Sequence, residues 1–346
     1  GESLRTVSQQ QPQLSQTNAE VICMAKTGEK LTVAFSCTAI ATDIKGFSEA
    51  KAAKDFVYIG RDVTDRQRAR KRKVVQYATT RILSECETVK MAIAEILPVV
   101  CRSLGWQAAE LWMPEIGEKL LSVTKRKIPI SDPNLLRCVA SWLNRSISIP
   151  KFVEFAEQMT FAVGEGFVGR VWGSGSSEWI ADVAENDSFV RKEIAAEEGI
   201  HGAFGFPILG DYDQELSARS VLGVMTFFSL EVQSFDEELL QTMTTIGSQI
   251  GQFIKRKQAE SALRESEEQL RDLFENATDL IQSIGADGHF LYVNRAWKET
   301  LGYSESEIAR MTVFDIIHPN SSPDSTDVLY QAISIKNITE TTFYPD

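Results

Sequence analysis

The stretch GEGFVGRVW, residues 164–172, decides the fold: a turn built on two glycines opens directly into a helical pattern. Further helical patterns lie at 151–159 and 189–198. Short strand patterns surround them: WQAAELWM (106–113), LLRCVASWL (135–143), SEWIADV (177–183), HGAFGFPI (201–208) and SVLGVMTFF (220–228). Strands mixed with helices at irregular intervals, without a βαβ rhythm, favour an α+β fold built on an antiparallel sheet.

Long helical patterns flank this region on both sides. Gly and Pro are absent from 65 to 97, and apolar residues step by three or four between Ile82 and Val100, which predicts one long amphipathic helix. A second helix is predicted to start near Ser234, where Ser234 and Glu237 resemble a capping box. A heptad repeat at 263–277 continues it, so a coiled coil and a lone amphipathic helix both fit.

The two ends of the chain carry shorter patterns. Residues 20–63 read as three strands joined by turns, an antiparallel meander without a second layer to cover it. Residues 273–346 begin with strand, turn and strand, continue with a short helix, and reach Asp346 without a closing strand. The length of 346 residues suggests roughly two or three domains, and we expect the chain to begin and to end inside a domain.

Composition narrows the classes of partner. The net charge of −12 and pI near 5.0 disfavour nucleic acid and anionic membranes, because neither attracts an acidic protein. The five cysteines form no CxxC pair, so they predict reduced thiols and no metal site. The longest apolar stretches are about half of the roughly 18–20 residues that a membrane helix needs. We therefore expect a cytoplasmic protein whose partners are proteins or small molecules.

Both ends resemble parts of PAS domains. VYIGRDVTDR (57–66) is similar to the last strand of a PAS domain and its exit into a signalling helix, so the resemblance implies a signal junction at Asp62, Thr64 and Arg66. A carboxylate and a hydroxyl suit that place because they can cap helix N–H groups. Five segments, in order along the chain, resemble the front part of a second PAS domain: LFENA (273–277), ADG (286–288), YVN (292–294), LGYS (301–304) and FDIIHP (314–319). Asn294 is predicted to cap the helix that follows it, and Gly302 to end that helix.

The middle of the chain resembles the GAF domains of bacterial sensor kinases. The matching segments are 164–172, WIADV (179–183), GIHGAFGFPI (199–208), VLGV (221–224) and IGSQIGQF (246–253). Together the resemblances imply a PAS-GAF-PAS sensor region of a two-component histidine kinase. The implied domains are the C-terminal half of a PAS domain (1–65), a linker helix (66–84), the GAF domain (85–255), a coiled-coil-like linker (256–272) and the N-terminal part of a second PAS domain (273–346).

The GAF and PAS families imply pockets that hold bilin, haem, flavin, cyclic nucleotide or nothing. A covalent bilin is disfavoured because no cysteine precedes a histidine, and a cysteinyl-flavin because the Asn-Cys-Arg-Phe motif is missing. Cyclic-nucleotide binding is unsupported, because the GAF segment lacks the Asn-Lys pair of the subclass that binds these ligands. Haem would need an axial ligand, for which His201 is the GAF candidate, although a hydrogen-bonded structural histidine is the alternative. The cofactor therefore stays open between a noncovalent ligand and none.

If the GAF pocket is occupied, aromatic and sulfur-containing side chains are its predicted walls, with an ordinary apolar core as the alternative. The candidates are Trp112, Cys138, Trp142, Phe161, Trp172, Trp179, His201, Phe204, Phe206 and Phe227.

No catalytic motif occurs in the chain, and its three histidines lie in sensor-like contexts. The expected function is that of a sensory and transmission module, which relays a ligand or partner signal through helical linkers, as a homodimer, to a downstream kinase domain. A cyclic-di-GMP cyclase or phosphodiesterase as the parent, and a ligand-free dimerisation spacer, are the alternatives.

Overall fold

The computed structural model describes residues 17–26, 30–41, 54–114, 135–213, 218–285 and 287–318. It divides into two compact units, Gly1–Lys257 and Gln258–Asp346, which are described separately below. Helix α8 (Glu237–Asn276) begins in the first unit and ends in the second. Within the described ranges, every helix is too short or too polar to cross a membrane.

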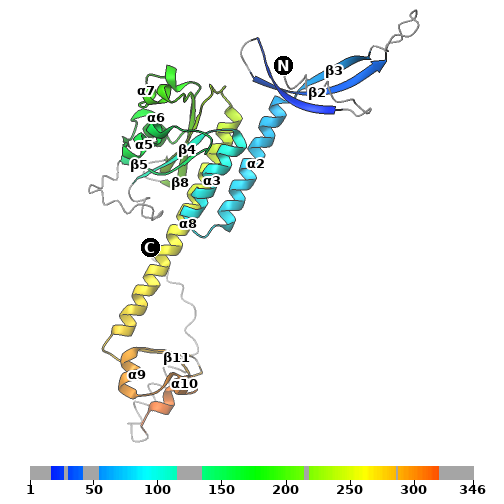
Figure 1. Ribbon diagram of the computed structural model, residues 1–346. Helices are drawn as coiled ribbons and strands as arrows, with labels where there is room; N and C mark the ends of the chain where they lie inside the picture. The colour runs from blue at the N-terminus through cyan, green and yellow to red at the C-terminus, as the bar shows by residue number, and fades with distance from the viewer. Residues whose placement is uncertain are drawn as a thin grey trace, which may run out of the picture. The chain divides into compact units, whose positions relative to one another are not determined.

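The centre of the first unit is an antiparallel sheet of six strands (Figure 1). Their order across the sheet is β6 (Thr160–Ala162), β5 (Leu135–Leu143), β4 (Ala108–Pro114), β9 (Ala218–Ser229), β8 (Gly202–Asp213) and β7 (Glu178–Ile180). The predicted α+β class is thereby confirmed. β6 is absent from the predicted strands because its three residues are too few to show a period.

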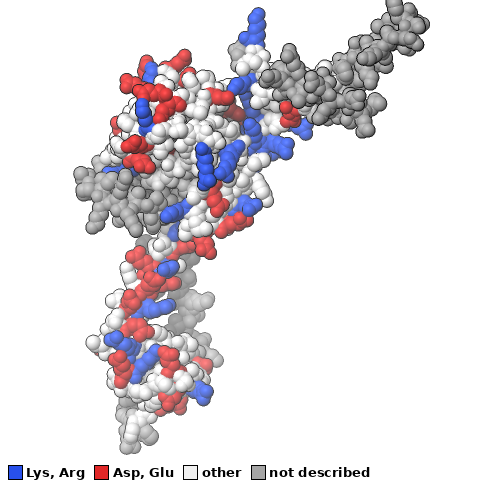
Figure 2. Space-filling view, viewed as in Figure 1, with Lys and Arg blue, Asp and Glu red and all other residues white. Residues whose placement is uncertain are grey.

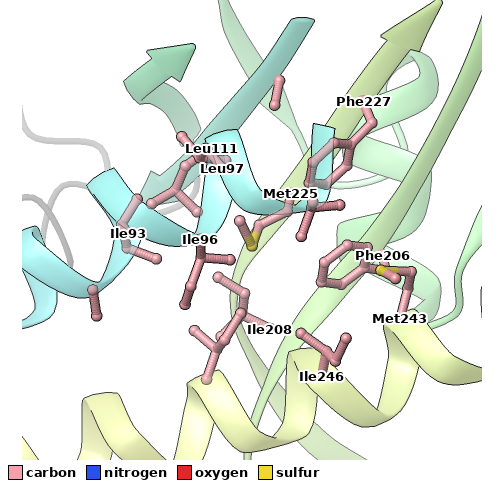
Figure 3. Close-up of a cluster of buried hydrophobic side chains, with 14 of the residues drawn as sticks. Ile93, Ile96, Leu97, Leu111, Phe206, Ile208, Met225, Phe227, Met243 and Ile246 are labelled. Atoms are coloured by element: carbon pink, nitrogen blue, oxygen red, sulfur yellow. The ribbon is translucent and has the colours of Figure 1, made fainter. Parts of the chain in front are cut away.

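Two layers of helices cover the sheet, and each encloses an apolar core. On one face, which we call the helical face, α3 (Val89–Leu104) and α8 pack against alternate residues of β4, β8 and β9, and α2 (Thr64–Glu85) packs against α3. Figure 3 shows Ile246 of α8 beside Phe206 of β8, and Ile96 of α3 in the same cluster. On the opposite face, which we call the inner face, lie α5 (Pro150–Gln158), α6 (Gly166–Ser174) and α7 (Lys192–Glu197).

Three details of the long helices differ from the prediction. The expected single helix is broken at 86–88 into α2 and α3, because Thr88 is extended and its side chain caps the N–H of Met91. Pro98 does not end α3, which continues to Leu104. The predicted capping box at Ser234 is wrong as well: Asp236 accepts the N–H of Leu239 at 2.9 Å and caps α8.

Helix α8 lies unusually close to strand β8 at two glycines. A Cβ atom on Gly247 would stand 2.1 Å from the carbonyl oxygen of Pro207, and one on Gly251 would stand 1.9 Å from that of Leu209. Only glycine permits this approach of backbone to backbone. The two glycines, one turn apart, therefore set the distance between α8 and the sheet.

A second, smaller sheet precedes α2 in the first unit. It is a meander of β1 (Thr17–Met24), β2 (Lys30–Ala41) and β3 (Lys54–Asp62), as the strand patterns predict. Ile22, Met24 and Ile59 are exposed on it.

The second unit contains the end of α8, a hairpin and short helices. β10 (Gln282–Ile284) pairs with β11 (Phe290–Val293), followed by α9 (Arg295–Leu301), α10 (Glu305–Ile308) and the 3-10 turn η2 (Val313–Ile316). Asn294 caps α9 through the N–H of Trp297, and Gly302 ends it with φ of 77°, both as predicted. The amide of Asn294 also donates to the carbonyls of Phe274 and Asp279, so this buried side chain fastens the end of α8 to the hairpin.

Candidate functional site

The predicted pocket residues divide between the two faces of the central sheet. Alternate residues of a strand point to opposite sides, and this alternation, with the register of β4, β9 and β8, places Trp112 and Phe204 on opposite faces. The inner-face core contains Trp112, Cys138, Phe161 and Trp172. The helical-face core contains Trp142, Trp179, Phe204, Phe206 and Phe227. These residues therefore do not line one common pocket.

The inner face carries a buried ion pair between Glu110 and Arg191. Glu110 comes from the middle of β4, and Arg191 from the residue before α7. Two guanidinium nitrogens donate to the two carboxylate oxygens, with Nη1 2.7 Å from Oε1 and Nη2 2.8 Å from Oε2. The side chains are only 2% and 4% exposed. Charges so deeply buried persist only when they are paired and hydrogen-bonded.

Further contacts complete the hydrogen bonding of this pair. Oε2 of Glu110 also accepts from Nε1 of Trp112 at 3.0 Å and from Oγ1 of Thr226 at 3.4 Å. The guanidinium carbon of Arg191 lies 3.8 Å from the ring centroid of Phe152, a cation–π distance. The pair is thus enclosed by aromatic groups and satisfied by its neighbours.

Cys138 lies on β5 near this pair, and its Sγ stands 3.6 Å from the carbonyl oxygen of Ala140. Burial raises the pKa of its thiol well above the ordinary value. The Glu110 carboxylate raises it further, and Arg191 opposes the shift. At neutral pH the group is a protonated thiol, which is neither a nucleophile nor a good metal ligand.

His201 lies apart from both cores, immediately before β8. Its Nδ1 stands 3.1 Å from Oδ1 of Asp182, and the same carboxylate oxygen accepts the N–H of Ala184. The side chain of His201 is 37% exposed. An open groove of about 620 Å³ runs past Asp182, lined by Trp179, Ile180, Ala181, Asp182, Glu185, Asn186, Asp187 and Val232.

Each unit contains a segment that matches the model of a known family. Residues 89–255 match the model of the GAF domain, and residues 268–342 match that of the PAS fold. The chain contains a GAF domain and a PAS domain. The sheet of β4–β9, with α3, the inner-face helices and the first half of α8, lies within the GAF match, and the hairpin with α9 and α10 lies within the PAS match.

A sensor and several GAF domains of known structure are similar to the chain. The methyl sulfide methyltransferase-associated sensor of Methanosarcina acetivorans is 30% identical over 174 residues, which are 49% of this chain and 17% of that relative's length. A GAF domain from A. aeolicus is 24% identical, with a TM-score of 0.39 over 55% of this chain and 98% of its own. The GAF domain of a Coxiella burnetii phosphoenolpyruvate-protein phosphotransferase is 18% identical, with a TM-score of 0.42. The match covers 56% of this chain and 98% of that domain's chain.

The central residues of the inner face of the GAF domain, Glu110 and Arg191, are absent from the predicted site. Glu110 is the one charged residue in the otherwise apolar stretch 108–113, which is a signal of a buried, partnered carboxylate. Arg191 offers no comparable signal, because it lies in a polar helical stretch where a cation is ordinarily exposed. Only the folded chain brings the two together, across 81 positions of sequence.

The predicted signal junction lies between β3 and α2. Oδ1 of Asp62 accepts from the N–H of Thr64 at 2.9 Å and from its hydroxyl at 2.6 Å. The Thr64 hydroxyl in turn accepts the N–H of Thr32 in β2 at 2.8 Å. Arg66 is exposed. The start of α2 is therefore hydrogen-bonded to two strands of the small sheet.

We expect the Thr64→Val substitution to raise the pKa of Asp62. The side-chain hydrogen bond from Thr64 is the largest cause that lowers this pKa, and the backbone N–H of Thr64 is the next. A lowered pKa stabilises the fold above the ordinary value near pH 4, and the stabilisation is lost as the pH falls through the folded-state pKa. An NMR titration of the Asp62 carboxyl group measures the change. Thr80→Val on the exposed side of α2 is the control, and an unchanged Asp62 titration in Thr64→Val would contradict the assignment.

Proposed function

We propose that the chain is the sensory and signal-transmission module of a cytoplasmic two-component histidine kinase. In this proposal residues 1–65 are the C-terminal half of a PAS domain, which precedes the GAF domain. A small ligand or a partner bound to the GAF or PAS domain alters the packing of α2 and α8, and the altered packing reaches a downstream kinase domain. Bistable helix packing, and no chemistry within the chain, passes on the signal.

The observation that carries the proposal is helix α8. Its 40 residues begin on the central sheet of the GAF domain, where Leu239 and Met243 are buried, and end at Asn276. Near that end, the carbonyl of Phe274 accepts from the amide of the PAS residue Asn294. A continuous helix transmits displacement at one end to the other, because its backbone hydrogen bonds resist bending. The sensor from Methanosarcina acetivorans supports the sensory part by its name.

The output domain is tested by the coding sequence beyond Asp346. An Asn- and Gly-rich ATP-binding region together with a phosphoacceptor histidine is the expected result. A Gly-Gly-Asp-Glu-Phe motif would instead assign the module to a cyclic-di-GMP cyclase and overturn the kinase part of the proposal.

We also propose that the chain is a homodimer through its linker helices, including a coiled coil after the GAF domain. Leu263, Leu270 and Leu273 are 62%, 51% and 70% exposed, and they stand at a and d positions of one heptad frame. Exposed leucines at this spacing are suited to packing against the same stripe of a second copy.

The double substitution Leu263→Ala/Leu270→Ala is therefore expected to weaken dimerisation about 100-fold or more, because each truncation is felt twice in a symmetric dimer. Sedimentation equilibrium of the full chain measures the dissociation constant. Glu265→Ala changes a c position of the same helix and is expected to leave it unchanged. Equal dissociation constants for the two variants would exclude this stripe as the interface.

The ligand-free spacer is kept as a second candidate because side chains of the chain itself fill the inner face. Trp112, Phe152, Phe161 and Phe228 are all at most 2% exposed there. Native mass spectrometry of the chain purified from its own host separates the two candidates: a bound small molecule supports the sensor. The unliganded mass, with no thermal stabilisation by host metabolite extracts, supports the spacer.

A further inference from the structure

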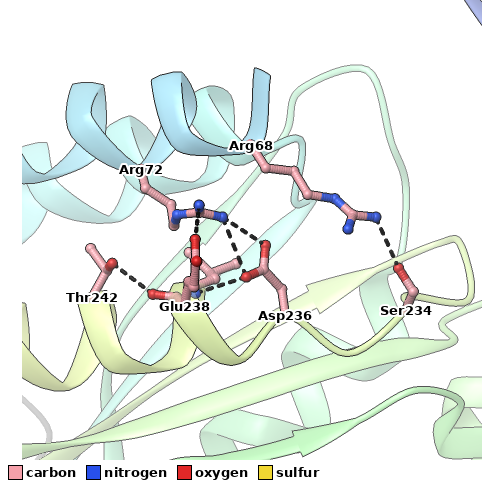
Figure 4. A network of polar contacts seen from close by, with 7 residues as sticks. Arg68, Arg72, Ser234, Asp236, Glu238 and Thr242 are labelled. Carbon is pink, nitrogen blue, oxygen red and sulfur yellow. Dashed lines mark hydrogen bonds and ion pairs between the residues drawn. The ribbon is translucent and has the colours of Figure 1, made fainter. Parts of the chain in front are cut away.

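The first half of α2 is held by polar contacts against the segment that leads into α8 (Figure 4). Arg72 reaches Asp236 at 3.2 Å and also contacts the carboxylate of Glu238. Arg68 donates to the hydroxyl of Ser234 at 3.3 Å. The Arg72 and Asp236 side chains are only 13% and 16% exposed, so solvent screens this pair less than a surface salt bridge.

Charge complementarity favours this contact. Residues 66–73 carry six cations, and Figure 2 shows basic side chains gathered along this part of α2. The facing segment 231–238 carries four carboxylates. Glu231 of this segment makes a further ion pair, at 2.7 Å, with Lys30 of the small sheet. Two of these six cations, Arg68 and Arg72, thus contact the segment that leads into α8.

Asp236 has two roles in this arrangement. Its Oδ1 accepts the N–H of Leu239 at 2.9 Å, and its carbonyl accepts the N–H of Leu240 at 3.1 Å, so it begins the first turn of α8. The same carboxylate binds the guanidinium of Arg72. A shift of this carboxylate would leave the Leu239 N–H without an acceptor, which is costly at a helix start. It would also break the ion pair with Arg72, so the shift affects both helices.

The segment before Asp236 is fastened to the edge of the GAF sheet. The N–H of Gln233 donates to the carbonyl of Ala181 at 3.1 Å, and its carbonyl accepts from Nε1 of Trp179 at 3.2 Å. These hydrogen bonds hold Asp236 in place at the edge of the GAF sheet. Helix α2 can therefore bind to Asp236 or leave it while Asp236 stays in position.

We propose that the Arg72–Asp236 contact is a latch that couples the position of α2 to the first turn of α8. While α2 is bound, Arg72 orients the carboxylate that caps Leu239. When the small sheet draws α2 away, the carboxylate loses this partner and the start of α8 opens more often. Arg72 is thus a positioning residue for α8, although it lies on another helix. The coupling goes beyond the proposed sensor function and holds whatever output domain follows.

Hydrogen exchange of the full chain tests the latch at two sets of amides, those of α2 at 66–76 and those of Leu239 and Leu240. Arg72→Gln is expected to accelerate exchange at both sets by about fivefold or more. Arg70→Gln removes an exposed cation of the same helix and is the matched control, with no change at either set. Asp236→Ser removes the ion pair but keeps a good N-cap, so only α2 exchanges faster.

The decisive comparison is the double variant Arg72→Gln/Asp236→Ser. With serine as the cap, Arg72→Gln is expected to have no further effect on Leu239, because the cap no longer depends on the guanidinium. The proposal is overturned if Leu239 exchanges equally in Arg72→Gln and Arg70→Gln. It is also overturned if Arg72→Gln accelerates hydrogen exchange of the Leu239 amide as much in the Asp236→Ser background as in the chain with Asp236.

Discussion

Replacing Arg191 with Met is expected to lower the free energy of unfolding of the GAF domain by about 3–5 kcal/mol. The loss arises because Glu110 stays buried on the inner face with its charge unpaired, and the methionine supplies only apolar contact to Phe152. Urea unfolding followed by tryptophan fluorescence measures it, since five of the six tryptophans lie at 106–179 within the GAF domain.

Two comparisons identify burial of the pair as the cause. Arg170 and Glu178 form a similar two-bond pair, but their side chains are 32% and 30% exposed, so Arg170→Met is expected to cost at most about 1 kcal/mol. In Glu110→Gln/Arg191→Met the neutral amide still accepts from Trp112. This double variant is expected to be more stable than Arg191→Met alone. Equal losses for Arg191→Met and Arg170→Met would show that burial does not strengthen the pair.

Gly251→Ala is expected to destabilise the GAF domain by about 3 kcal/mol. Alanine ordinarily favours a helix over glycine by about 1 kcal/mol. Here steric repulsion outweighs that gain, because the new methyl group would stand 1.9 Å from the Leu209 carbonyl oxygen and α8 would have to move off the sheet. The same urea unfolding experiment measures the change.

Gln252→Ala is the control for Gly251→Ala. This neighbouring side chain is exposed, so its removal is expected to change the stability by at most about 0.5 kcal/mol. A Gly251→Ala variant as stable as the Gln252→Ala variant would show that α8 and β8 are not in backbone contact.

The sequence predicts the fold of this chain more completely than its candidate site. The longer strands of the central sheet and helices α5, α6 and α8 were predictable because their apolar periods extend over enough residues. The break at Thr88 was not predictable from the apolar period, because it depends on one local side-chain cap. The pocket residues were predicted from their aromatic or sulfur-containing side chains, without regard to the face of the sheet on which each lies. Strand alternation within β4 separates Trp112 from Leu111, but relating Trp112 to Phe204 also needs the strand register, and the partner of Glu110 becomes evident only when α7 is placed over β4.

The two glycines of α8 also restrict how this helix can move. Successive residues are turned by about 100° around a helix axis, so a rotation of α8 in place would carry Ser248 or Gln252 into the carbonyls of Pro207 and Leu209. Up to Lys257, the helix is therefore expected to slide along its axis or tilt as a rigid rod, and torsion is confined to the residues beyond. In the proposed function, a signal that leaves the GAF domain would therefore begin as a slide or tilt of α8, and only the helix beyond Lys257 could convert it into a twist.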